Sequence, residues 1–161
     1  MVEMQKEITV KTEKEEINRI EGFVDEICDQ YNIFNSYFAN INNAVIECFE
    51  IIYNHIVNAG LEKREVTILF YSGRNHLTFR LISPIEVFKK EYLSESAEGY
   101  NNDIQKPYII MKYLSDDINI SPDSKVCEIS FYISSINYDK TIERNTLVNE
   151  YFDKINTTKK V

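Results

Sequence analysis

Residues 35–60 carry the longest regular hydrophobic pattern in the chain, and this pattern limits how the chain can fold. Apolar side chains recur there at steps of three and four residues, at Phe38, Ile41, Val45, Cys48, Ile52, Ile56 and Ala59. The spacing predicts one long amphipathic helix, which Asn35 or Ser36 can cap and Gly60 can stop in a left-handed conformation. A helix with one apolar stripe needs a second layer to bury that stripe, so we expect a layered fold.

Alternation of apolar and polar residues predicts the strands. It predicts an antiparallel hairpin over Glu65–Ile82, with turn-forming residues at positions 72–75. The same alternation predicts strands at Ile8–Val10 and Cys127–Ser134, and Ile118–Ile120 is expected to form a small strand. Each strand has one apolar face, which is typical of antiparallel sheets with one face on the core.

Three further helices are expected. An apolar stripe from Ile17 to Tyr31 predicts the first, and Thr141–Ile155 is expected to be the last. Between them, Tyr108–Leu114 reads as a short helix, with a proline at position 107 suited to its first turn. Residues 83–106 are polar and mixed, so we expect a long mobile connection with one helical turn around Val87–Leu93.

The element order is therefore β–α–α–β–β–loop–α–β–β–α. This order predicts an α+β two-layer sandwich, in which helices pack on one face of a mostly antiparallel mixed sheet. We expect residues 1–161 to form a single domain, with a core over residues 7–134 and an extra C-terminal helix over residues 141–155.

Composition restricts the partners and the location. The net charge of −8 excludes a nucleic-acid partner, because neutralising phosphates needs a clustered basic surface. No apolar run approaches the roughly 20 residues of a membrane span, and the polar start of the chain lacks a secretory hydrophobic region. Cys28, Cys48 and Cys127 stand among apolar residues without motif spacing, which indicates reduced core thiols in a cytoplasmic protein.

The element order and lengths resemble the histidine-kinase-like ATPase fold of the GHKL family. The residues that carry the resemblance are Ala-Val-Ile-Glu at positions 44–47 of the long helix, His55 two turns later, Glu65–Phe70 as the next strand and Tyr108–Asp117 as the late helix. The compact bacterial anti-sigma-factor serine kinases are the most similar branch, and the resemblance covers about residues 7–134. It implies a nucleotide pocket beside the long helix.

In this family the long helix holds a glutamate that orients or activates water, and an asparagine four residues later helps to bind Mg²⁺. The resemblance places Glu47 at the glutamate position, but Ile51 stands four residues later and offers no oxygen to a hard cation. Glu50 and Asn54 provide a second pair with the same four-residue step, and Asn58 follows. Alternatively, these polar residues are only the solvated face of an amphipathic helix.

The adenine and phosphate positions depart further from the family. After the third strand the family has Asp-x-Gly, whereas this chain has Ser83-Pro84-Ile85-Glu86; Glu86 could replace the acid, but Ile85 is β-branched where close approach is needed. Before the late helix the family uses a glycine-rich turn to cradle phosphates. Residues 102–107 contain no glycine and end in a proline, although Lys106 could bind an anion. We therefore expect no conventional Mg-ATP binding.

The sequence thus predicts a degenerate relative of the anti-sigma kinases that acts by protein binding, without an enzymatic activity, a cofactor or a metal. Glu47 is the one catalytic candidate. The vestigial pocket is expected to consist of Glu47, Glu50, Ile51, Asn54, Ser83, Ile85, Glu86 and Lys106. The resemblance implies a regulatory protein as partner, either a sigma factor or its antagonist, and a homodimer.

Two alternatives remain open at this point. The first is an active ATP-binding serine kinase that uses Glu50, Asn54 and Glu86 with ATP and Mg²⁺ in a shifted pocket. The second is a small-molecule sensor, which requires a closed apolar cavity near Ile51, Ile85 and Ile109. Zinc chemistry and nucleophilic catalysis are not supported, because the chain has two histidines and no matching motif spacing.

Overall fold

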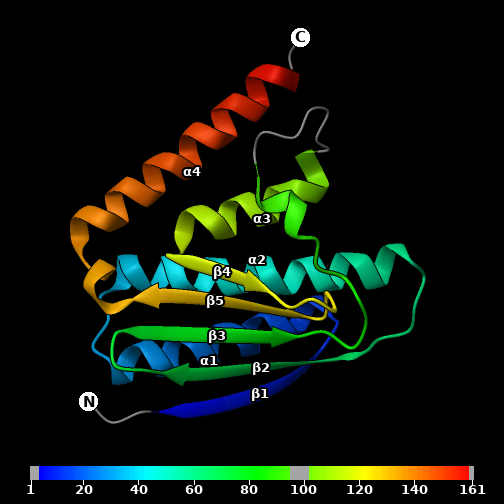
Figure 1. The fold of residues 1–161 in the computed structure, drawn as a ribbon, viewed down its shortest axis with the longest axis horizontal. Coiled ribbons are helices and arrows are strands. Elements are labelled where there is room, and N and C mark those ends of the chain that lie inside the picture. The colour runs from blue at the N-terminus through cyan, green and yellow to red at the C-terminus, as the bar shows by residue number, and fades with distance from the viewer. Residues whose placement is uncertain (1–3, 95–101, 160–161) are drawn as a thin grey trace.

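The computed structural model describes residues 4–94 and 102–159, and its elements follow the predicted order (Figure 1). The strands and helices are β1 (Gln5–Lys11), α1 (Ile17–Gln30), α2 (Asn35–Asn58), β2 (Glu65–Ser72), β3 (His76–Ile82), α3 (Asn102–Leu114), β4 (Asp117–Ile120), β5 (Val126–Tyr132) and α4 (Tyr138–Lys159). Short 3₁₀ turns stand at η1 (Lys14–Glu16), η2 (Lys90–Leu93) and η3 (Ile133–Ser135). The predicted α+β class is confirmed.

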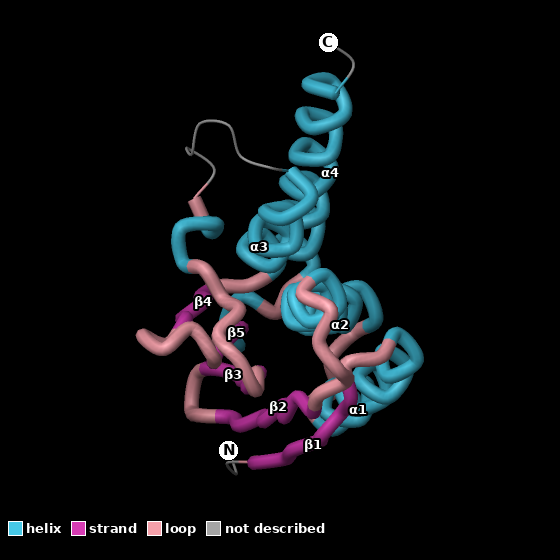
Figure 2. Tube along the Cα trace, turned by 90° about the vertical axis from the view of Figure 1, so that its right-hand side faces the viewer, coloured by secondary structure: helices cyan, strands magenta, loops and turns pink. Residues whose placement is uncertain are grey.

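The five strands form one sheet in the order β1-β2-β3-β5-β4. Every neighbouring pair is antiparallel, so the parallel pairing that a mixed sheet would contain is absent from the described strands. The register places Ile68, Leu81 and Cys127 side by side on one face. Side chains of this face are buried because α1 and α2 lie against it, which gives the two layers seen in Figure 2.

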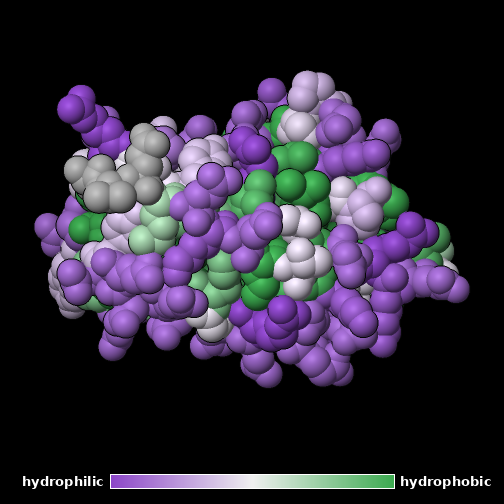
Figure 3. Space-filling model, turned by 90° about the horizontal axis from the view of Figure 1, so that it is seen from below, coloured by the Kyte–Doolittle hydropathy of each residue, from purple (hydrophilic) through white to green (hydrophobic). Residues whose placement is uncertain are grey.

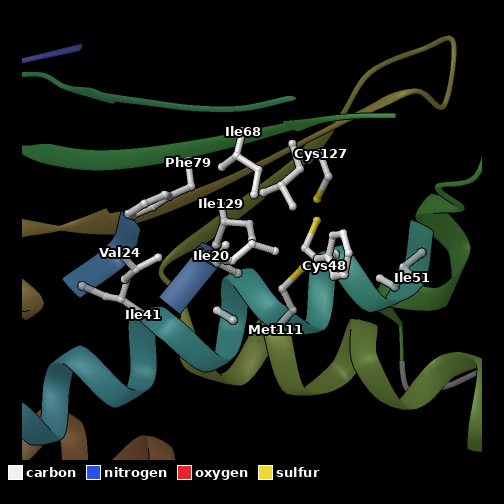
Figure 4. Packing of buried hydrophobic residues seen from close by; sticks show 14 of the residues in the cluster. Ile20, Val24, Ile41, Cys48, Ile51, Ile68, Phe79, Met111, Cys127 and Ile129 are labelled. Carbon is white, nitrogen blue, oxygen red and sulfur yellow. The ribbon is translucent and has the colours of Figure 1, made fainter. Parts of the chain in front are cut away.

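The long helix α2 lies at the centre of the fold. Its sheet-facing stripe is fully buried, and Figure 4 shows Ile41 and Cys48 packed toward Phe79 and Ile129 of the sheet. Gly60, just beyond the helix, has a φ of +68°, a value that glycine adopts without a Cβ penalty. The predicted left-handed stop is confirmed, and it frees the chain to turn into β2.

Helix α3 begins earlier than the sequence indicated. It starts at Asn102 and not at Tyr108, so Pro107 lies inside the helix rather than in its first turn. Proline removes one N–H from the helix, but the turn before it is held by Gln105, whose side-chain amide donates to carbonyls of the preceding segment. A tertiary contact of this kind outweighs the local signal of the proline.

The connection after β3 is more ordered than expected. Ser83 N–H donates to the Lys125 carbonyl at 2.7 Å, and the N–H groups of Val87 and Phe88 both donate to the Ser124 carbonyl at 3.0 Å. The helical turn expected in this segment is the 3₁₀ turn η2. Residues 83–94 are therefore anchored to the loop before β5, while residues 95–101 of the expected mobile connection lie outside the described residues.

The last helix is longer than predicted, spanning Tyr138–Lys159 in place of Thr141–Ile155. It crosses over α3, away from the sheet (Figure 1), and buries Tyr151 and Ile155 against Ile109 of α3. Among the described helices, this one included, none is long and apolar enough to cross a membrane.

The β1 side of the molecule leaves part of the core near the surface. Met4 and Ile8 are only partly buried, although both pack against the core. Seen from below, hydrophobic side chains form a band across the middle of this face, bordered by hydrophilic ones (Figure 3). Some hydrophobic surface therefore remains accessible on this side of the molecule.

Candidate functional site around Glu47

Glu47 is a half-buried carboxyl on α2. Among the described residues it makes no hydrogen bond or ion pair. Burial raises its pKa to about 7, with a further increase from the neighbouring Glu50 carboxylate, and Lys106 opposes both. A carboxyl group in this state is partly protonated at neutral pH, which is unusual for a group with only a structural role.

Three helices meet at this point. Lys106 comes from α3, and its Nζ lies 4.7 Å from the ring centroid of Phe152 on α4. The lysine is close enough to lower the pKa of Glu47, but not to form an ion pair with it. The structure therefore brings Glu47, Glu50 and Lys106 close together, three of the eight residues expected in the vestigial pocket.

The two candidate magnesium positions differ in exposure. Ile51, four residues after Glu47, is 7% exposed and belongs to the main hydrophobic core. Asn54, four residues after Glu50, is exposed to solvent. A cation site built on Glu47 is thus blocked by the buried side chain of Ile51. A site built on Glu50 and Asn54 would instead face solvent.

The segment at residues 83–86, where the resemblance would place the Asp-x-Gly motif, folds onto itself. Ser83 is 3% exposed, and its Oγ donates to the Ile85 carbonyl at 2.7 Å and accepts from the Ile85 N–H at 3.3 Å. Ile85 packs partly buried against the core, and Glu86 is exposed. Neither Ser83 nor Glu86 forms a hydrogen bond or ion pair with α2 among the residues that the structure describes.

Tyr108 fills the space between α3 and the segment after β3. It is 2% exposed; its hydroxyl accepts from the Lys89 N–H at 3.1 Å and donates to the Val87 carbonyl at 3.5 Å. The Tyr92 ring packs edge-on against it, with centroids 5.4 Å apart. Burial raises the pKa of the Tyr108 phenol. The phenol is thus a structural group that fastens the segment onto α3.

Gln105 forms a second set of hydrogen bonds between α3 and the segment after β3. Its Nε2 donates to the carbonyls of Tyr92 at 3.2 Å and Ser94 at 2.6 Å, whereas its buried Oε1 has no hydrogen-bond partner. Sequence reasoning did not predict the hydrogen bonds of Gln105 or Tyr108. No local pattern marks them, because their partners lie 11 to 21 residues away in the chain.

Sequence reasoning also missed a buried arginine. Arg144 of α4 is 2% exposed; its Nη2 lies 2.7 Å from Asp116 Oδ1, and its Nη1 donates to the Tyr37 hydroxyl at 2.6 Å and the Leu114 carbonyl at 3.1 Å. Asp116 also accepts from Ser135 Oγ at 2.9 Å. The signal that could have revealed the cluster is a lone arginine within the apolar stripe of the last helix.

The three isoleucines expected around a sensor cavity do not belong to one cluster. Ile51 and Ile85 pack in or against the main core, whereas Ile109 faces α4 and packs with Tyr151 and Ile155. Ile51 and Ile85 therefore lie apart from the cluster that contains Ile109.

The three cysteines are buried and unpaired, as expected of core thiols. Figure 4 shows the sulfur atoms of Cys48 and Cys127 pointing toward each other between α2 and β5. Burial, together with this neighbouring thiol, raises the pKa of Cys48 well above its usual range, so it is an inert core group.

Chemically, the site offers one half-buried acid and one nearby lysine. Within residues 4–94 and 102–159 no group of three or more His, Cys, Asp or Glu side chains could hold a metal ion. No protein-family model matches this sequence, and no curated protein matches it either. A functional proposal must therefore rest on the structure itself, and in particular on Glu47, on Tyr108 and on the segment at residues 83–94 that Tyr108 holds against α3.

Proposed function

We propose that this chain is a cytoplasmic regulatory module of the bacterial anti-sigma-factor type, which binds another protein and no longer binds nucleotide. The observation that carries the proposal is the position of Tyr108. In the family that the sequence resembles, the nucleotide lies between the long helix, the segment after the third strand and the start of the late helix. In this chain the Tyr108 side chain, from the middle of α3, is hydrogen-bonded to the segment after β3 and holds that segment against the helix.

The surrounding side chains support the same proposal. Ile51 replaces the magnesium-binding asparagine with a buried hydrocarbon, and a hard cation needs oxygen ligands. Ser83 turns its hydroxyl to Ile85, two residues further along the chain. Glu47 remains at the glutamate position with a raised pKa, which suits an inherited residue whose ligands have been lost.

The resemblance suggests the kind of partner, a sigma factor or its antagonist, and a homodimer as the working form. A protein that has lost its nucleotide switch can still exchange between partners by competition for one surface. Binding then depends on the concentrations of the partners and not on the nucleotide present.

Isothermal calorimetry of the full chain against purified sigma factors and anti-sigma antagonists from the same cell tests this proposal. We expect at least one to bind, with the same affinity in the presence and absence of millimolar Mg-ATP. Transfer of phosphate to the partner, or an affinity that changes tenfold with nucleotide, would overturn the proposal in favour of the active kinase. Failure of every regulatory protein to bind would overturn it as well.

A further inference from the structure

We propose that the free edge of β4 is a docking surface for an extended segment of a partner protein, one with apolar residues at alternate positions and acidic residues around them. The inference rests on the proposed protein-binding function and names the surface and the chemistry of the segment. The β4 edge lies opposite β1 in the sheet (Figure 2).

The backbone groups at this edge are available. Ser121 N–H donates to the Val126 carbonyl at 2.9 Å, and the register continues with Asn119 opposite Glu128. Since hydrogen-bonded residues alternate in antiparallel pairs, Ile118 and Ile120 turn their N–H and C=O groups away from β5. Those four groups have no hydrogen-bond partner among the described residues, so an added strand could pair with them.

A hollow lies at each end of this edge. One, of about 240 Å³, lies between Leu93 of η2 and Ile118. The other, of about 460 Å³, lies between Phe88 and Ile120. The side chains of Ile118 and Ile120 lie on the core face of the sheet, opposite Ile129 and Cys127. Residues two apart on an added strand would project to this same face, one toward each hollow.

The charged groups beside the hollows determine which charge a partner segment should carry. Lys89, Lys90 and Lys112 line them, together with Glu91, Asp116 and Asp117. Asp116 is neutralised by Arg144 at 2.7 Å, which leaves three exposed lysines against two exposed acids. On a chain with a net charge of −8, this local excess of positive charge favours an acidic segment.

The opposite edge of the sheet is protected at the end of β1, at Lys11, and by a charged pair at Lys6. At β1 the Lys11 N–H donates to Glu16 Oε2 at 2.9 Å, and the Lys11 carbonyl accepts from the Glu13 N–H at 2.8 Å. Lys6, on the core side of the strand, is paired with Glu26 of α1 at 2.9 Å. Inward-pointing charges and capped edge groups are devices that prevent strand addition, and β4 has neither at Ile118 or Ile120.

The test is an NMR titration of the full chain with a short capped peptide that alternates valine and glutamate, and with its valine–lysine counterpart. We expect amide shifts at residues 88–93 and 117–121, with the glutamate peptide binding about tenfold more tightly. The double variant Lys89→Glu/Lys90→Glu should lose this preference. The charge-matched control Lys11→Glu/Lys14→Glu, at the β1 side, should retain it.

Ile118→Pro provides a second test, because it removes an outward N–H and leaves the hydrogen bonds between β4 and β5 in place. It should weaken peptide binding in a chain whose unfolding transition stays cooperative. Equal binding of both peptides, no binding of either, or shifts confined to other elements would overturn the inference. If a regulatory protein binds while hydrogen exchange at β4 is unchanged, the edge inference fails but the proposed function stands.

Discussion

Two polar clusters, one buried and one half-buried, lie between helices, and they differ in how their charges are satisfied. At one, the Arg144 guanidinium has a carboxylate, a phenol and a carbonyl within 3.1 Å. At the other, Glu47 has no hydrogen-bond partner among the described residues, and burial raises its pKa to about 7. A buried charge is tolerated when it is paired and hydrogen-bonded, and is otherwise neutralised.

This difference separates a cluster that stabilises the fold from a carboxyl group that does not, as expected if Glu47 is a remnant of the proposed degenerate pocket. The Arg144 cluster joins α4 to α2 and to the turn before β4, so its replacement should weaken the fold. Glu47 makes no comparable contact, so the carboxylate opposes folding and its replacement should strengthen the fold. Replacing Arg144 should therefore lower the free energy of unfolding, and replacing Glu47 should raise it.

The largest effect is expected from Arg144→Ala. The change leaves Asp116 nearly buried without its cation, and breaking a buried pair in this way costs about 3–5 kcal/mol of the free energy of unfolding. Urea denaturation measures it. The control is Arg19→Ala, which removes an exposed pair with Glu16 at 2.7 Å and should cost less than about 1 kcal/mol. Equal losses of unfolding free energy in the two variants would show that the Arg144 cluster does not stabilise the packing of α4.

Glu47→Gln is expected to stabilise the protein at alkaline pH. The folded-state pKa of about 7 lies above the reference value of 4.5, so the folded state binds the proton more tightly than the unfolded state does. Stability of the unchanged protein therefore falls as the pH rises from about 4.5 to 7, and levels off above. The gain from glutamine at pH 8 should be on the order of 2–3 kcal/mol, and it should vanish near pH 4.

The measurement is the free energy of unfolding of both proteins across pH 4–8. Glu21→Gln, at an exposed position of α1, is the matched control and should leave the profile unchanged. A loss of stability in Glu47→Gln at pH 8 would mean that the carboxylate has a favourable partner, and the contrast with Arg144 would then disappear.

A smaller effect is expected from Tyr108→Phe. Removing the hydroxyl leaves the Lys89 N–H and the Val87 carbonyl without this partner, which should cost about 1 kcal/mol. Hydrogen exchange should become faster at residues 87–89 and remain unchanged in α2. Unchanged exchange in this segment would indicate that Tyr108 does not fasten it, and would weaken the case for a closed pocket.

The parts of the fold that the sequence predicted depend on local periodicity. The α2 stripe and the alternation in β2, β3 and β5 repeat over many residues, so each segment reports its own structure. The predicted start of α3 was wrong because Pro107 is a strong local signal. Gln105, which holds the earlier turn, acts through hydrogen bonds to residues 11 and 13 positions away. Tertiary contacts of this kind can override the local conformational preference of a residue such as proline and so move the start of a helix.

Local helical geometry likewise accounts for the part of the site that the sequence predicted. Glu47, Glu50 and Ile51 lie on one helix, so their relative placement follows from helical geometry. The approach of Lys106 depends on how α3 packs on α2, and the Arg144 cluster joins residues up to 107 positions apart. Such pairings become visible only once the helices are placed together.

The most direct test of the proposal that the nucleotide pocket is degenerate is a thermal shift of the full chain with Mg-ATP at millimolar concentration. A ligand at a hundred times its dissociation constant stabilises a folded protein by about 2.7 kcal/mol, which is readily measured. We predict no shift. A saturable shift that is abolished by Asn54→Ala would contradict the proposed loss of nucleotide binding and would establish a pocket on the Glu50–Asn54 face of α2.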